Sequence, residues 1–323
     1  MSIITVLLSK IESTKVKFIS LKYLGEDGAL RQIDIAAKNL LISEDFILVN
    51  NIKLRPINEY CFVDPFRSYA TLFCLCDNLS DQYNARLFLQ ENILANNHVN
   101  NITVELGINF TVINKSENFI FKEHKLIHYQ NQVEPYDQLA NFRAEILDIL
   151  EKVGIPTVLH CHARKFSSCS IVIKAHNFLN IADYLVITNF IIQNVAESYG
   201  KVAYFVNDLK NDLYLSFSGE GYNKKLAPTI ISNIIHNLEN SANNVYFVNP
   251  LTYSVAEVEN SLKLTTYDHH TNAGQNSDKL HLKLYQSINP YLAISYLMVY
   301  GLNNKSTGKT SQEILESYFG IND

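Results

Sequence analysis

The stretch PTVLHCHARKFSSCSIVIK, from Pro156 to Lys174, places two histidines on either side of a cysteine, with a second cysteine close behind. Histidine nitrogens and cysteine sulfurs at short spacing are typical zinc ligands, so a metal site is the first chemistry to consider. The stretch has the apolar pattern of a strand, and successive side chains of a strand point to opposite faces. His160 and His162 are therefore expected on one face and Cys161 on the other, which argues against one ion held by all three.

Two other stretches resemble functional motifs without satisfying them. The Gly-Lys-Thr run at 308–310 ends like a phosphate-binding loop, but the required earlier glycine is Asn303, and the run follows a predicted helix where the motif needs a strand. The Asp-His-His run at 268–270 offers metal ligands, yet no second cluster is placed to complete a site. Both runs are predicted to be polar loops.

The composition is that of an ordinary folded protein. Apolar residues make up 47% of the 323 residues and charged residues 18%, which excludes a disordered chain. The formal net charge is -5 and no segment carries a dense Lys/Arg stripe, so no nucleic-acid partner is expected. We see no run approaching the ~20 apolar residues of a membrane span and no basic leader, so neither a membrane nor export is expected, and the predicted location is cytoplasmic.

The cysteines are odd in number and lie on apolar, strand-like runs, which indicates buried reduced thiols more than a disulfide framework. They are Cys61, Cys74, Cys76, Cys161 and Cys169.

The length favours two domains. The first ~95 residues read as a small α+β unit, with a helix at the start followed by strands at VKFISLKYL, LRQIDIAAKNLL and either side of Asp64-Pro65. From Thr103 strands alternate with long helices. The helix YDQLANFRAEILDILEKVG has Gly154 as its stop, and the next helix ends at Gly200. Later helices are predicted at APTIISNIIHNLENSANN, NPYLAISYLMVYGL and TSQEILESYFG, and the strand KLHLKLYQ alternates cleanly.

The order of several motifs is more specific than any of them alone. Asp-Pro-Phe at 64–66 precedes an apolar strand, Asn-Pro at 249–250 is followed by Ser254, and NPYLA at 289–293 opens a helix. In this order the chain resembles the glutamine synthetase family from end to end. The resemblance implies an α+β fold, with a small N-terminal β-grasp-like domain at 1–95. A larger glutamine synthetase-type catalytic domain of antiparallel strands backed by helices follows at 96–323.

Family members join glutamate to ammonia through a γ-glutamyl phosphate made from ATP, with divalent cations held in a funnel of antiparallel strands. Hard divalent cations take oxygen ligands, so the funnel strands must supply several carboxylates. Negative charge on the transferred phosphoryl group calls for arginines as well. The resemblance therefore implies ATP and Mg²⁺ or Mn²⁺ as cofactors only if the family activity persists.

On the metal side, most of the matching positions are substituted. The family's Glu-x-Glu strand keeps Glu105 but has Gly107 in the second place. The family's His-His-Glu falls on the Cys-His-Ala run at 161–163, so Ala163 replaces a metal-binding glutamate, and Ser170 replaces another.

The nucleotide and substrate side is rewritten as well. The two histidines of the family's glycine-rich segment fall on Tyr214 and Ser216, and Glu257 stands in place of a substrate arginine. The last Glu-x-Arg strand becomes His281-x-Lys283. The Asn-Arg-Ser loop is missing, and FILVNNIKL replaces the amino-terminal latch that completes a neighbouring subunit's site.

These losses share one site, and an ion left there without its ligands costs several kcal/mol. We therefore hypothesise a catalytically silent pseudoenzyme with a binding or regulatory role. The alternative is an active ATP-dependent carboxylate-amine ligase with a rebuilt site. This alternative is based on four possible remnant residues of the funnel: Glu105, His162, His281 and Lys283. Glu105 is also a possible metal ligand. Expected partners are its own copies in a ring or a true glutamine synthetase.

Overall fold

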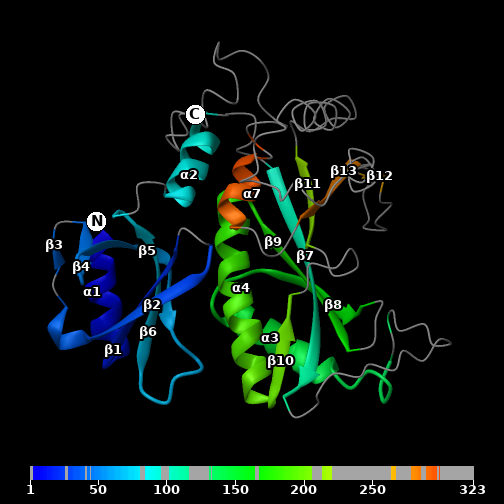
Figure 1. Cartoon of the computed structure of the whole chain (residues 1–323), viewed down its shortest axis with the longest axis horizontal. Helices are drawn as coiled ribbons and strands as arrows, with labels where there is room; N and C mark the ends of the chain where they lie inside the picture. Colours follow the sequence, from blue (N-terminus) through cyan, green and yellow to red (C-terminus); the bar gives the residue numbers. More distant parts are fainter. Residues whose placement is uncertain are drawn as a thin grey trace. The chain divides into compact units, whose positions relative to one another are not determined.

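The chain divides between Phe88 and Leu89 into two units, each of which is described by itself. Figure 1 shows a computed structural model of the whole chain. The structure describes residues 3–25, 28–40, 42–43, 45–80, 84–95, 102–115, 131, 133–163, 167–205, 213–219, 263–266, 278–284, 289–296 and 298.

In the first unit, helix α1 (Ile3–Thr14) packs on a six-stranded sheet in the order β2-β1-β6-β5-β4-β3. Strands β1 and β6 are parallel and the other neighbours are antiparallel. The strands are β1 (Phe18–Leu24), β2 (Leu30–Ala36), β3 (Ile42–Ser43), β4 (Phe46–Val49), β5 (Ile52–Val63) and β6 (Thr71–Asn78), with a 3-10 turn η1 (Ala37–Asn39) after β2 and helix α2 (Ala85–Ala95) after β6.

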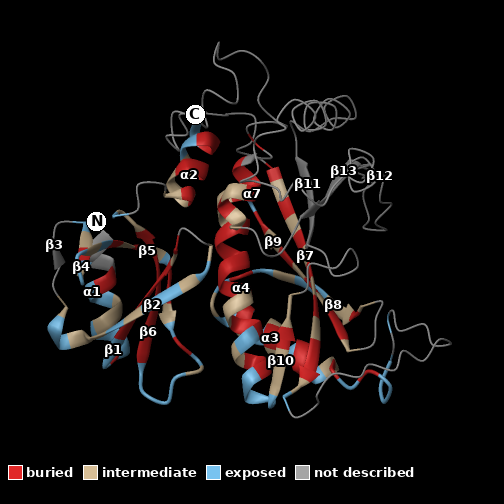
Figure 2. Cartoon of the chain, viewed as in Figure 1, coloured by how far each residue is buried: buried red, intermediate tan, exposed pale blue. Residues whose placement is uncertain are grey.

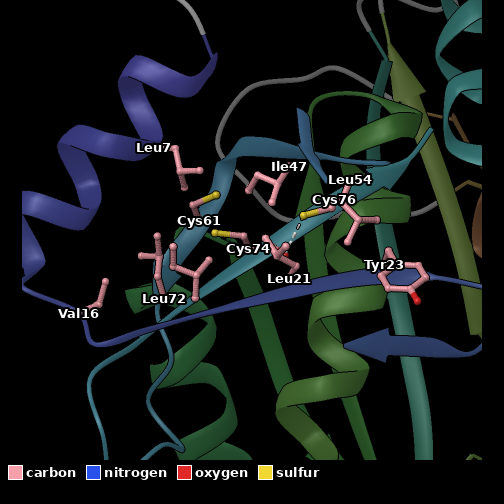
Figure 3. Packing of buried hydrophobic residues seen from close by; sticks show 11 residues of the cluster. Leu7, Val16, Leu21, Tyr23, Ile47, Leu54, Cys61, Leu72, Cys74 and Cys76 are labelled. Atoms are coloured by element: carbon pink, nitrogen blue, oxygen red, sulfur yellow. Dashed lines mark hydrogen bonds between the residues drawn. The ribbon is translucent and has the colours of Figure 1, made fainter. Parts of the chain in front are cut away.

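The core of the first unit lies between α1 and the sheet. Figure 3 shows Leu7 of α1 above Leu21 of β1 and the thiols of Cys61 and Cys74, which are opposite each other on β5 and β6. Burial raises the pKa of Cys74 and Cys76 well above the usual value, so both stay protonated and act as small apolar side chains. All five cysteines are free, and four of them are buried, as the sequence predicted; Cys161 is partly exposed.

Two of the sequence motifs form local turns. After β5, Asp64 Oδ1 accepts a hydrogen bond from Phe66 N at 3.0 Å, which closes the turn at 64–66. Asn289 Oδ1 accepts from Tyr291 N at 3.1 Å, so Asn289 caps α7 (Pro290–Tyr296) and Pro290 takes the first helical position.

The second unit is built on a seven-stranded antiparallel sheet in the order β12-β13-β11-β7-β9-β8, with β10 paired to β7. The strands are β7 (Ile102–Asn114), β8 (Thr157–His162), β9 (Ser168–Ala175), β10 (Lys201–Tyr204), β11 (Leu213–Gly219), β12 (Lys263–Thr266) and β13 (Asp278–Leu284). Helices α3 (Ala140–Lys152) and α4 (Phe178–Ser198) pack on strands β7 to β10, and α7 packs on α4.

Helices α3 and α4 end where the sequence predicted. Gly154 (φ +86°) and Gly200 (φ +65°) follow them in the left-handed region that glycine adopts without a steric cost. Asn177 is the N-cap of α4, and its side chain accepts a hydrogen bond from Asn180 N at 2.7 Å.

Helix α4 corrects one expectation from the sequence. Its 21 residues are long and apolar enough to cross a membrane, but 61% of the apolar window is buried inside the structure. Figure 2 shows this burial along α4 and along β7, which is drawn to the right of the helix. The apolar run is therefore a core helix of the second unit.

The stretch from Pro156 to Lys174 is a hairpin of two strands, β8 and β9, where a single strand was expected. The intervening ARKFS at 163–167 contains none of the Gly, Pro, Asn or Asp residues that mark turns, and Ser167 before β9 has φ +56°. Strands β3, β4 and β12 were also not predicted, and the helices expected at 227–244 and 310–320 lie outside the described residues.

Candidate functional site

Strand β7 separates two faces of the sheet in the second unit. Val104, Leu106, Ile108 and Phe110 are buried, whereas the residues between them are only partly buried. The buried set packs toward α4. We call the other side, which carries Glu105, Gly107 and Asn109, the open face.

The backbone register places one row of polar residues across five strands. Glu105 is opposite Lys174 of β9 and Ser216 of β11. Ser216 is opposite His281 of β13, which is opposite Lys263 of β12. Because residues directly opposite each other lie on the same face of a sheet, all five positions belong to the open face.

A second row lies two residues further along each strand. Gly107 is opposite Val172 and Tyr214, and Tyr214 is opposite Lys283. Val172 is also opposite Leu159 of the edge strand β8.

In the third row Asn109 is opposite Ser170, which is opposite Cys161. Strand pairing therefore gathers seven of the positions considered from the sequence on one face: Glu105, Gly107, Ser170, Tyr214, Ser216, His281 and Lys283.

His162 lies on the opposite face, so it does not share a funnel with Glu105. It is 5% exposed and opposite Cys169, which is fully buried. Its Nδ1 is 2.8 Å from the carbonyl oxygen of Ala163. The strand alternation expected for the two histidines is present, but it turns both of them toward the helices and leaves Cys161 on the open face.

Behind the sheet, an ion pair joins Arg143 of α3 to Asp137. Arg143 is 1% exposed; its two terminal nitrogens donate to the two carboxylate oxygens of Asp137, and its Nε donates to His160 Nδ1 at 3.3 Å. Asp137 Oδ1 also accepts from Leu139 N at 3.2 Å. The bidentate geometry satisfies both buried charges, as a buried ion pair requires.

The electrostatics of this cluster follow from its burial. Burial alone raises the pKa of Asp137, but the hydrogen bonds from Arg143 and from the Leu139 amide outweigh it, and the pKa lies below its usual value. Burial and the Arg143 charge lower the pKa of His160, so this imidazole is neutral at pH 7. The cluster stabilises the packing of α3 on β8 and β9, and none of its members reaches the open face.

The carboxylates needed for a divalent cation are sparse. In the three rows described above, Glu105 is the single acidic residue. Across the part of the chain that the structure describes, no group of three or more His, Cys, Asp and Glu residues is placed to hold a metal ion.

Other positions considered from the sequence lie at the edge of the described structure or beyond it. Ala163 follows β8 directly, and its N–H donates to Ser168 O at 2.9 Å. The positions outside the described residues are Glu257, the runs at 249–254 and 268–270, and the Gly-Lys-Thr run at 308–310.

Residues 90–212 match the family model for the glutamine synthetase catalytic domain. The glutamine synthetase of Azospirillum brasilense is 32% identical over 74 residues, which is 23% of this chain and 16% of that enzyme. The 3-hydroxylaminophenol mutase of Cupriavidus pinatubonensis is 35% identical over 75 residues, with the same coverage. The chain is glutamine synthetase-like. The match spans about a sixth of the length of these relatives, so their activities are not carried over by it.

Solved structures extend the glutamine synthetase-like fold to most of the chain. The Plasmodium falciparum glutamine synthetase superposes with a TM-score of 0.70 at 14% identity, covering 92% of this chain and 74% of that one. GmaS in complex with ADP gives a TM-score of 0.65 at 16% identity, covering 92% and 80%. The expected resemblance is confirmed, as is a mixed α+β fold with antiparallel strands.

Sequence reasoning missed the buried ion pair, although a signal was present. Arg143 lies four residues after Leu139 and three before Ile146, so it interrupts the apolar stripe of α3. A charge in that stripe predicts a buried partner, here Asp137. The position of Lys174 opposite Glu105 was not predicted either. Strands β7 and β9 are separated in the sequence by α3 and β8, so no local pattern relates the two residues.

Proposed function

We propose that this glutamine synthetase-like chain is a catalytically silent pseudoenzyme that acts by binding. The observation that carries the proposal is the register of the open face, where Glu105 stands among residues that are neutral or basic. A glutamine synthetase reaction needs several carboxylates around its dications. Here Gly107 and Ser170 occupy neighbouring positions on that face and supply none.

The sign of the charges also opposes a divalent cation. Lys174 is directly opposite Glu105, and Lys283 lies in the adjacent row. Two unit charges ~4 Å apart interact by about 4 kcal/mol at an effective dielectric of 20, and a dication doubles that term. A lysine near the metal position therefore cancels much of the attraction that a single carboxylate provides.

The second candidate function is an active ATP-dependent ligase that joins a carboxylate to ammonia or an amine through a rebuilt site. It is favoured by one observation: Glu105 and His281 share a row, separated by the single position of Ser216. Glu105 would be the metal ligand in such a site, and Mg²⁺ or Mn²⁺ would polarise the phosphates when bound.

The two functions are separated by assaying the purified full chain with ATP, glutamate, ammonia and Mg²⁺ or Mn²⁺. A pseudoenzyme gives no phosphate release above the protein-free blank, while a motif-complete glutamine synthetase in parallel shows that the assay works. Release that needs glutamate and disappears in Glu105→Ala, but not in the exposed control Glu12→Ala, would establish the ligase instead.

We also infer the finer architecture and setting. The parallel pair of β1 and β6 in the interior of the first sheet, with α1 packed on that sheet, supports a β-grasp-like first domain. The domain limits at 1–95 and 96–323 and a cytoplasmic location stay predictions. Assembly into a ring, or onto a true glutamine synthetase, is also a prediction. Mass photometry of the chain alone, and of the chain mixed with such an enzyme, tests it.

A further inference from the structure

Lysines on the open face gather at one corner of the sheet. Lys263 of β12 is opposite His281 of β13. Lys279 and Lys283 lie two residues to either side of His281, and alternation along β13 places all three on the same face. Residues two apart on a strand are separated by ~7 Å and neighbouring strands by ~4.8 Å. Each of the three lysine positions therefore lies within about 7 Å of the histidine position, and the two lysine positions on β13 are about 13 Å apart.

This basic corner is confined to one face. The intervening residues of β13, which alternation places on the other side, are Leu280, Leu282 and Leu284. The chain as a whole carries 27 Lys and Arg against 32 Asp and Glu, so its composition does not account for a local excess of lysine. Asp278 begins β13 but falls on the face of Leu280, so the nearest acidic residue on the open face of the described strands is Glu105. Glu105 is two strands away from His281 and directly opposite Lys174.

Hydroxyl-bearing residues border the corner. Ser216 and Tyr214 of β11 are opposite His281 and Lys283 respectively. Lysines attract carboxylate or phosphate oxygens as point charges, and hydroxyl groups donate hydrogen bonds to the same oxygens. Four positions that can carry positive charge at this spacing match a ligand with more than one anionic group.

We propose that this corner, formed by β11, β12 and β13, binds a small polyanion with two or more carboxylate or phosphate groups, directly and without a divalent cation. The inference rests on the proposed binding function, since it names the class of ligand for the rewritten face. It differs from metal-bridged nucleotide binding in one respect: lysines replace the cation as the source of positive charge.

Isothermal titration calorimetry with the full chain in EDTA tests the proposal, with pyrophosphate and citrate as separate probes. Saturable 1:1 binding of either probe that weakens as NaCl rises from 50 to 300 mM is expected. Binding of pyrophosphate alone assigns the phosphate class, and binding of citrate alone assigns the carboxylate class. Absence of binding by both probes, or binding that requires added Mg²⁺, would overturn the proposal.

The variants locate the site. Lys283→Glu is expected to weaken binding at least tenfold, and Lys283→Arg is expected to bind within about twofold of the parent chain. Lys152→Glu is the matched control, because it makes the same charge change at an exposed position of α3 and should leave binding unchanged. Equal effects of Lys283→Glu and Lys152→Glu would reject the corner as the site.

If Lys283→Glu does not fold by circular dichroism, Lys279→Gln supplies the same test with a smaller change. The result is also distinct from that of the activity assay. Phosphate release in the activity assay would overturn the pseudoenzyme proposal. The polyanion site would still be supported if metal-free binding were observed and were lost in Lys283→Glu. If the protein is inactive and binds neither pyrophosphate nor citrate, only the polyanion proposal is overturned.

Discussion

Tyr291 donates a hydrogen bond from its phenolic oxygen to Asp183 Oδ1 at 2.7 Å, joining α7 to α4 across 108 residues of sequence. The tyrosine is 3% exposed and the aspartate 0%. Tyr291 belongs to the NPYLA motif that supported the family resemblance. In this chain the motif therefore stabilises the packing of two helices, independently of any catalytic residue.

Replacing Tyr291 with phenylalanine is expected to lower the free energy of unfolding by about 1.5–3 kcal/mol, because the buried Asp183 carboxylate loses a donor. Urea denaturation measures the change. Tyr199→Phe is the matched control: Tyr199 also donates to a carboxylate, Glu145 Oε2 at 2.7 Å, but at an exposed site. Its expected loss is below about 0.5 kcal/mol, and equal losses in the two variants would contradict the role given to burial.

The buried ion pair behind the sheet gives a second prediction. Arg143→Met leaves the Asp137 carboxylate buried without its partner, and a loss of about 3–5 kcal/mol is expected. Adding Asp137→Leu should restore part of that loss, because the unpaired charge is then gone. The exposed pair of Lys152 and Asp148 is the control, for which Lys152→Met should cost less than about 1 kcal/mol. A double variant no more stable than Arg143→Met would argue against the unpaired charge as the cause.

His160 predicts a pH dependence of stability. Its pKa is lowered in the folded chain by burial and by Arg143, so the unfolded chain binds the proton more tightly. The neutral imidazole therefore stabilises the fold fully above its unfolded pKa of about 6.5, and this contribution is lost as pH falls below that value. In His160→Gln, urea denaturation between pH 7.5 and 5 should show a shallower decline than in the parent chain. An unchanged slope would exclude His160 as its source.

Asp137 acts in a lower window of pH. Its folded pKa is depressed, so its contribution is present above the unfolded value of about 3.9 and disappears as pH falls through the folded pKa. The Arg143→Met and Asp137→Leu double variant should therefore lose stability less steeply below pH 4 than the parent chain. A decline equally steep in both proteins would place the acid sensitivity elsewhere.

The glycine after α3 provides a backbone test. Gly154 has φ +86°, and a Cβ there would meet nothing within 4 Å, so the cost of a side chain comes from the backbone conformation alone. Gly154→Ala is expected to lose about 1–2 kcal/mol in urea denaturation, and Gly154→Asn less, because asparagine tolerates the left-handed region better. Equal losses for the two substitutions would point to a steric cause instead.

Local patterns in the sequence predicted much of this fold. The apolar spacing of α3 and α4, the glycines that end them, and the alternation of β7 and β13 are properties of a few neighbouring residues, set by helical and strand geometry. The motif order also identified the resemblance to glutamine synthetases, and alternation separated Cys161 from the two histidines beside it.

The tertiary structure decided what those faces meet. Which side of β8 is covered by α3, and hence that His162 is buried, depends on packing between segments that no local pattern relates. The row from Glu105 to Lys174, Ser216, His281 and Lys263 depends on backbone hydrogen bonds between strands whose paired residues are up to 111 positions apart in the sequence. A shift of one residue in any pairing would send a strand's side chains to the other face, so only the assembled sheet determines which residues share a site.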